Sequence, residues 1–286
     1  MSGTDRGPFR IVFWGVRGSI PTPGPSTVKF GGNTSCVEVR CGNELIIFDG
    51  GTGLRGLGNQ LMARGGPIRA TMFFSHVHWD HIQGFPFFAP AFVPGNSFEL
   101  YGGHNVTHTL AETLQGQMNY PNFPVTLAQM GATMRFRDLQ EGEVVRLGPD
   151  GDVRVRASRL NHPDGVFGYR LEYGGRSVVY ATDTEHYEYL DPKVLELAQG
   201  VDVFIYDAAY TPEEYSGESG FGAKIGWGHS TMIEGAKLAK AAGVKQLVLF
   251  HHDHVQDDPA VTKKEERAKV LFPNTVAAYE GLTIEL

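Results

Sequence analysis

Short apolar runs and stretches of alternating apolar and polar residues recur along the chain, separated by segments rich in glycine and proline. Such runs, bounded by turn-forming residues, are typical of β-strands. In the first part of the chain, strands are expected at Ile11 to Trp14, Thr34 to Arg40, Leu45 to Phe48 and Ala70 to Phe74. The pattern therefore predicts a protein with a large amount of β-sheet.

The same pattern returns after residue 150. Strands are expected at Val153 to Leu160, Tyr169 to Tyr173, Ser177 to Thr182, Val201 to Tyr206 and Leu247 to Phe250. Two glycines separate the second and third of these runs, which predicts a β-hairpin.

One helix carries clear end signals. Thr231 and Glu234 have the spacing of a capping box, and the helix is expected to continue to about Ala242, where Gly243 is well placed to end it. The segment from Gly84 to about Arg137 is different, because prolines and aromatic residues alternate irregularly there. We interpret it as an aromatic-rich loop-and-helix insertion that either covers the core or forms a lid or dimer surface.

Composition limits the architecture and the partners. The chain has 286 residues with 41% hydrophobic content, which suits one domain over residues 1–286 with the insertion at about 84–137. Its formal net charge of -7 disfavours long nucleic acid and favours small substrates. The first ten residues lack a signal-peptide pattern and no apolar run could span a membrane, so a cytoplasmic protein is expected.

The strongest chemical signal is the segment SHVHWDH at 75–81, which directly follows an expected strand. Within it, His76 and His78 can face one metal ion while Asp80 and His81 turn toward another. Imidazole and carboxylate ligands together suit zinc, manganese or iron. The alternative, a chance histidine-rich surface loop, does not explain why four ligand-type side chains occur within six residues.

Three further ligand-type residues, His162, Asp183 and His251, each follow an expected strand. Strand ends that meet at one sheet edge can build a site from distant parts of a sequence. His252 adjoins His251, and the sequence does not distinguish which of the two faces the metal. Asp49 and Asp207 also follow strands, where they either accept hydrogen bonds from the ligand histidines or only form turns.

With these residues in place, the chain resembles the metallo-β-lactamase superfamily, whose hallmark is an H-x-H-x-D-H loop followed by a histidine, an aspartate and a late histidine. The resemblance covers most of the chain and implies an α/β fold, the four-layer αββα sandwich, with two divalent metal ions at one edge. It implies that the ligands of the first metal are His76, His78 and His162. By the same resemblance, the second metal is held by Asp80, His81 and His251, and Asp183 bridges the two ions.

The segment GHST at 228–231, followed by the strand and His251, is similar to the phosphodiesterase branch of the superfamily that contains ribonuclease Z. That similarity implies that His229 assists catalysis, as the acid that protonates the leaving oxygen. Asp80 is expected to act first as a ligand and also to orient His229 or the nucleophile. Otherwise His229 is only a helix-start residue with a local hydrogen bond. The basic arm with which ribonuclease Z binds tRNA is not visible in the sequence.

Other segments are similar to bacterial and phage cyclic-nucleotide phosphodiesterases, including the anti-Pycsar enzymes. They are WGVRGSIP at 14–21, GGNTSC at 31–36 and HWDHIQGF at 78–85. The resemblance implies homodimers, zinc as the expected metal, and contacts to phosphate or base from Arg17, Asn33 and Thr34.

The leading hypothesis is therefore a metal-dependent hydrolase that opens a 3′,5′-cyclic nucleotide to a linear monophosphate. The alternatives are a ribonuclease Z-like tRNA 3′ endonuclease, a lactone, thioester or β-lactam hydrolase, and a non-catalytic scaffold. The GHST segment counts against a carbonyl substrate, and ligand-type residues at all seven positions count against a scaffold.

Overall fold

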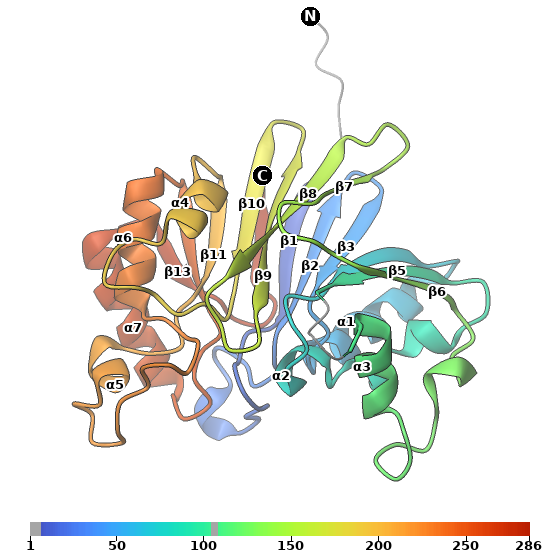
Figure 1. The fold of residues 1–286 in the computed structure, drawn as a ribbon, viewed down its shortest axis with the longest axis horizontal. Helices are drawn as coiled ribbons and strands as arrows, with labels where there is room; N and C mark the ends of the chain where they lie inside the picture. Colours follow the sequence, from blue (N-terminus) through green and yellow to red (C-terminus); the bar gives the residue numbers. More distant parts are fainter. Residues whose placement is uncertain (1–6, 104–107) are drawn as a thin grey trace, which may run out of the picture.

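The computed structural model describes residues 7–103 and 108–286, and within these residues two seven-stranded sheets pack face to face (Figure 1). The first sheet has the order β14-β1-β2-β3-β4-β5-β6. Its strands are β1 (Phe9–Gly15), β2 (Cys36–Cys41), β3 (Glu44–Phe48), β4 (Arg69–Phe73), β5 (Ser97–Gly102), β6 (Thr133–Asp138) and β14 (Thr283–Glu285).

The second sheet has the order β13-β12-β11-β10-β9-β8-β7. Its strands are β7 (Val144–Leu147), β8 (Val153–Leu160), β9 (Val166–Tyr173), β10 (Arg176–Ala181), β11 (Val203–Asp207), β12 (Gln246–Phe250) and β13 (Thr275–Ala277). The pairs β10–β11, β11–β12 and β12–β13 are parallel, whereas the pairs β7–β8, β8–β9 and β9–β10 are antiparallel.

Helices cover the outer face of each sheet, which gives the expected four-layer αββα sandwich (Figure 1). The α-helices are α1 (Gly53–Arg64), α2 (Trp79–Ile82), α3 (Leu110–Gln117), α4 (Pro192–Ala198), α5 (Pro212–Ser216), α6 (Met232–Ala242) and α7 (Asp258–Leu271). The 3-10 helices are η1 (Pro25–Thr27), η2 (Phe85–Phe87), η3 (Ala89–Phe92) and η4 (Leu127–Gln129). None of the helices in the described ranges is long and apolar enough to cross a membrane.

Three apolar cores hold the layers together. One lies between the sheets, where the inward-facing residues of the strands meet, as Val153, Val155 and Ala157 of β8 do. A second lies between the second sheet and α4, α6 and α7, and a third between the first sheet and the helices after β3 and β4. The alternation of apolar and polar residues predicted β8 from the sequence. In the structure it corresponds to side chains that point alternately to the inner and the outer face of the sheet.

The parallel part of the second sheet determines where the polar residues gather. β10, β11 and β12 run in the same direction, so their carboxyl ends meet at one edge. Asp183 follows β10, Asp207 ends β11 and His251 follows β12. Ligands in such sheets bind outside the carboxyl ends of the strands.

Most of the predicted elements are confirmed, and one interpretation is wrong. The Thr231 hydroxyl accepts a hydrogen bond from the Glu234 backbone N–H, and Gly243 ends α6 in a left-handed conformation. The segment 84–137 is more than loops and helices, because β5 and β6 lie within it and pair parallel to β4 and to each other. Because proline and aromatic residues are mixed irregularly along this segment, the strand pattern of β5 and β6 was not recognised in the sequence.

Candidate metal centre

The loop between β4 and α2 presents its four ligand-type side chains in two directions. His78 is extended and precedes α2, whereas Asp80 and His81 lie in the first turn of that helix. The change from extended chain to helix separates the side chains that precede α2 from those inside it. His76 and His78 therefore face one group of residues, and Asp80 and His81 face another.

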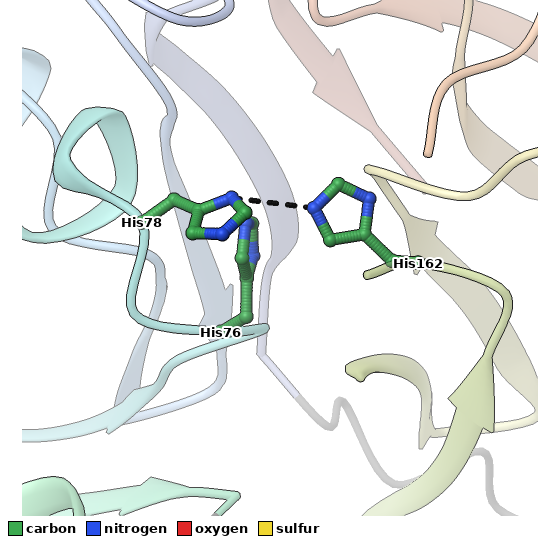
Figure 2. A group of neighbouring side chains, drawn as sticks. All are labelled: His76, His78 and His162. Carbon is green, nitrogen blue, oxygen red and sulfur yellow. Dashed lines mark hydrogen bonds between the residues drawn. The ribbon is translucent and has the colours of Figure 1, made fainter. Parts of the chain in front are cut away.

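The first group is His76, His78 and His162 (Figure 2). His162 follows β8 and brings its Nε2 to 3.3 Å from the Nδ1 of His78. The ring of His76 lies 4.4 Å from that of His78 and 4.8 Å from that of His162, measured between centroids. Three imidazoles thus converge from both sheets on one point.

The second group is Asp80, His81, Asp183 and His251, all of them buried. The Nε2 atom of His251 lies 3.0 Å from Oδ2 of Asp80, 3.2 Å from Oδ2 of Asp183 and 3.3 Å from Nε2 of His81. The Nε2 atom of His81 lies 3.2 Å from Asp80 and 3.3 Å from Asp183.

Asp183 lies between the two groups, since its Oδ2 is also 3.7 Å from Nε2 of His76. Its backbone has a φ of 53°, in the left-handed region that side chains other than glycine rarely adopt. Among the described residues, the other non-glycine positions with positive φ are Ser19, Asp49, Asp164 and His251. All of them belong to the two groups or to the residues around them, so strain is concentrated at this edge.

In two of the histidines, Nδ1 forms a hydrogen bond on the side of the ring that faces away from the ligand groups, so Nε2 faces the groups. His81 donates from Nδ1 to the Asp49 carboxylate at 2.8 Å, and His162 donates from Nδ1 to the Gly228 carbonyl at 2.9 Å. Because both partners only accept, Nδ1 carries a proton in each ring, and Nε2 is the nitrogen that can offer a lone pair to a metal ion. This arrangement is the usual one for metal-binding histidines.

The electrostatics differ between the two groups. Burial, together with the neighbouring His81, keeps the pKa of His76 well below its usual value, so that ring is neutral and one of its nitrogens has a lone pair available. Burial opposes ionisation of Asp183, but the surrounding imidazoles outweigh it and hold the pKa of the carboxyl well below its usual range. Burial lowers the pKa of His81, but Asp183, Asp80 and Asp49 outweigh it and raise that pKa well above its usual value, so His81 carries a proton that a bound metal ion would displace. The site therefore supplies imidazole nitrogens together with anionic oxygens.

These residues fit two divalent transition-metal ions. The Nε2 atom of His76 is buried and has no hydrogen-bond partner, which is costly unless something else binds it. A tetrahedral ion with nitrogen and oxygen ligands about 2.0–2.1 Å away holds those ligand atoms roughly 3.3 Å apart. The spacing in the second group is 3.0–3.3 Å. We therefore propose the seven residues of the two groups as the ligands, and zinc, manganese or iron as the metal.

His229 and Asp207 form a pair beside the second group. Nδ1 of His229 donates to Oδ2 of Asp207 at 2.9 Å, and the ring stacks on that of His251 with centroids 4.8 Å apart. Burial lowers the pKa of His229, but Asp207 outweighs it and raises the pKa to about 9. His229 also lines a cavity of about 420 Å³ with His78, Asp80 and Asp183, so a protonated imidazole faces the space beside the ligands.

The structure distinguishes the two adjacent late histidines. His251 belongs to the second group, whereas His252 is fully buried and donates from Nε2 to the Ala278 carbonyl at 2.9 Å. His252 is therefore a structural residue. Of the four histidines for which no role in the site was expected, His186 forms a hydrogen bond with Ser230, and His108 and His254 are exposed, whereas His104 lies outside the described residues.

The expected substrate contacts from the first loops are wrong for Arg17 and Thr34. Both side chains are fully buried. Arg17 donates to the carbonyls of Gly31 and Gln256 at 2.8 and 2.6 Å, which joins two loops, and the Thr34 hydroxyl accepts from the Thr52 backbone. The Asn33 amide is also occupied, since it donates to the Glu280 carboxylate at 3.0 Å.

Three residues that support the site were not singled out from the sequence, although Gly18 and Ser19 lie in the segment WGVRGSIP. The Ser19 backbone N–H donates to Asp80 at 2.7 Å. Gly18 packs so closely that a Cβ there would lie 2.3 Å from the His251 ring. Glu185 accepts from the backbone N–H groups of Gly226 and Gly228 at 2.7 and 2.8 Å, which holds the loop that carries His229.

Asp49 provides a prediction about these supporting contacts. Its carboxylate is fully buried and accepts from His81, from the Ser75 N–H and hydroxyl, and from the Tyr180 hydroxyl. Asp49→Asn cannot accept all four, and we expect it to weaken binding of the second metal by about 10–100-fold. Competition with a chromophoric chelator measures this, with exposed Asp152→Asn as control. Unchanged affinity would show that Asp49 only braces the fold.

Comparison with known proteins places this geometry in context. A family model described as a beta-lactamase superfamily domain matches residues 45–252. The ribonuclease Z of Synechococcus sp. (strain CC9311) is 26% identical over 336 aligned positions, covering 97% of this chain and 99% of the relative. Two solved structures share the fold. One is the metallo-beta-lactamase fold protein YhfI from Bacillus subtilis, with a TM-score of 0.73 and 19% identity, covering 98% of this chain and 100% of YhfI. The other is a diphosphatase from the PhnP family, with a TM-score of 0.68 and 18% identity, covering 97% of this chain and 98% of the diphosphatase.

Proposed function

The chain belongs to the metallo-β-lactamase superfamily and is a metal-dependent hydrolase, and from that premise we propose that it opens a 3′,5′-cyclic nucleotide to a linear nucleoside monophosphate. The single observation that carries the proposal of a phosphodiester substrate is the His229–Asp207 pair beside the proposed ligands. Breaking a phosphodiester releases a ribose alkoxide, which needs a proton from a positioned acid.

The chemistry divides between the metal pair and the protein. Two bound divalent ions supply Lewis-acid activation of water and neutralise charge on the phosphoryl oxygens. Asp207 holds His229 by Nδ1, so its opposite nitrogen, Nε2, is the atom left to carry the proton. A pKa of about 9 keeps that proton in place at neutral pH until the leaving oxygen develops charge.

Two observations favour a small cyclic substrate. The cavity lined by His229 and the ligands has a volume of about 420 Å³, which suits a small-molecule ligand. The chain also carries a net charge of -7, which opposes the approach of a polyanion. We include a homodimeric assembly in the proposal, because the large apolar side chains of Phe221, Ile225 and Trp227 are exposed on the segment before His229.

Cleavage of RNA is the second candidate, favoured by the similarity to proteins named ribonuclease Z along nearly the whole chain. One observation counts against it. The match with the Synechococcus protein spans 336 aligned positions, whereas this chain has 286 residues. At least 50 of those positions therefore have no counterpart here, which leaves less protein surface for a large RNA.

A turnover panel tests the proposal. Metal-loaded protein is expected to convert at least one of cyclic AMP, GMP, CMP and UMP to a linear monophosphate, which chromatography identifies. A precursor tRNA, nitrocefin and a bis-phosphodiester dye complete the panel. If no cyclic nucleotide reacted while the precursor tRNA was cut at its 3′ trailer, the ribonuclease function would replace the one proposed here.

A further inference from the structure

A second cavity adjoins the metal centre on the side of the first group of histidines. It has a volume of about 210 Å³, and its walls include His76, His78, Arg159, Asp164 and Phe167. Val77 and His78 also line the larger cavity that contains Asp183 and His229. Because they share these two lining residues, the two cavities are neighbours.

Arg159 is the only cationic side chain other than the histidines among the described residues that line this cavity. It is the second-last residue of β8. Because side chains alternate between the two faces of a strand, it lies on the same face as Val155 and Ala157. Its guanidinium stacks over the Phe167 ring at 4.8 Å from the centroid. A Cβ at Gly165 would lie 3.2 Å from its Nη1, so the guanidinium packs closely against this glycine.

The guanidinium has no carboxylate partner in residues 7–103 and 108–286. The Glu141 carboxylate accepts from the Arg159 backbone N–H, and the Arg159 carbonyl accepts from Lys193, so both contacts involve the backbone alone. Asp164, which is exposed, lines the same cavity without forming an ion pair with Arg159. A half-buried cation that is held in place but lacks a counter-ion is a ready binding group for an external anion.

We propose that Arg159 and this cavity form a subsite for a second anionic group of the substrate, chemically a phosphate attached next to the phosphodiester that is cut. The inference rests on the proposed phosphodiesterase function and extends it beyond cyclic mononucleotides, which carry a single phosphate. The planar guanidinium presents paired N–H donors that match two phosphate oxygens. Phe167 fixes the plane of that donor pair, which lowers the entropy lost when the anion binds.

The test compares dinucleotides that differ only by a terminal phosphate. The wild-type protein, loaded with metal, is offered UpU, pUpU and UpUp, with cyclic UMP and bis(p-nitrophenyl) phosphate as reference phosphodiesters. We expect kcat/KM to be higher for pUpU or UpUp than for UpU. In Arg159→Ala this preference, expressed as the ratio of the two kcat/KM values, should fall by about 10-fold or more.

Asp164→Asn is the matched variant in the same cavity, and metal content is measured for each protein. An anion subsite predicts that the preference for a terminal phosphate is kept or increased when the Asp164 charge is removed. If Asp164→Asn lowered kcat/KM as much as Arg159→Ala does, the two side chains would be reading a base edge, and the proposal would be wrong. Equal loss on UpU and pUpU in Arg159→Ala would show only a supporting role. Cleavage without any preference for the phosphorylated dinucleotides rejects the subsite alone, whereas no cleavage of any phosphodiester rejects the proposed function.

Discussion

Purified protein is expected to bind about two transition-metal ions per chain, and Asp183→Asn is expected to lose at least one of them together with its activity. Oδ2 of Asp183 lies 3.2–3.3 Å from the Nε2 atoms of His81 and His251 and 3.7 Å from that of His76. Among the residues that the structure describes, it is thus the one carboxylate that lies close to histidines of both groups. Without a shared anion, two divalent cations would face each other with little charge between them. We expect turnover to fall by at least about 10²–10³-fold.

Elemental analysis of the purified variant, combined with a turnover assay, measures both effects. Asp152→Asn is the matched control, because it removes a carboxylate from the exposed turn between β7 and β8 and should keep both metals. A pure wild-type preparation that held no metal, took none up and was still active would exclude the two-metal site. An Asp183→Asn protein with two metals and full activity would remove the bridging role from Asp183.

The proposed ligands could be predicted because each is a chemically distinctive side chain placed just after a recognisable strand. His162, Asp183 and His251 follow β8, β10 and β12. A sheet edge brings such positions together whatever lies between them in sequence. The histidines also had a pattern of their own in the loop at 75–81. The position after a strand and the spacing of the histidines are both local features of the sequence, so they can be recognised without knowledge of the tertiary structure.

Contacts between distant loops could not be predicted in this way. Arg17 was expected to contact the substrate because its segment resembles one in cyclic-nucleotide phosphodiesterases. It is instead buried against carbonyls from residues more than 230 positions away, those of Asp253 and Gln256. The sequence shows that an arginine is present but not which face of the loop it occupies. The same holds for Glu185, whose role depends on the backbone of residues 226 and 228.

The choice between His251 and His252 shows the limit most clearly. The two are chemically identical and adjacent, so residue type and spacing do not separate them. The decision depends on backbone conformation, because His251 has a φ of 59° and turns its ring toward Asp80 and Asp183. A residue with positive φ directly after a strand is a tertiary feature that no hydrophobic pattern encodes.

His229→Ala is expected to keep the fold and both metals, but its hydrolysis rate should fall by an amount that depends on the leaving group. The side chain donates to Asp207 and stacks on the face of His251, and it is not one of the seven ligands proposed here. An acid matters most when the departing alkoxide is basic. We therefore expect the rate on a substrate with a ribose leaving group to fall by about 10²–10⁴-fold. A diester with a nitrophenolate leaving group needs little protonation and should suffer much less.

The comparison of the two substrates isolates proton donation, provided that metal content is measured in the same preparations. His254→Ala is the control, because it removes an exposed imidazole that pairs with Asp253. Its rates on both substrates should match those of the wild-type protein. Equal losses on both substrates in His229→Ala, with two metals still bound, would mean that the protonated ring stabilises charge on the phosphoryl group or positions it. In that case the pKa of about 9 that Asp207 gives to His229 would serve to keep a positive charge beside the substrate rather than to deliver a proton.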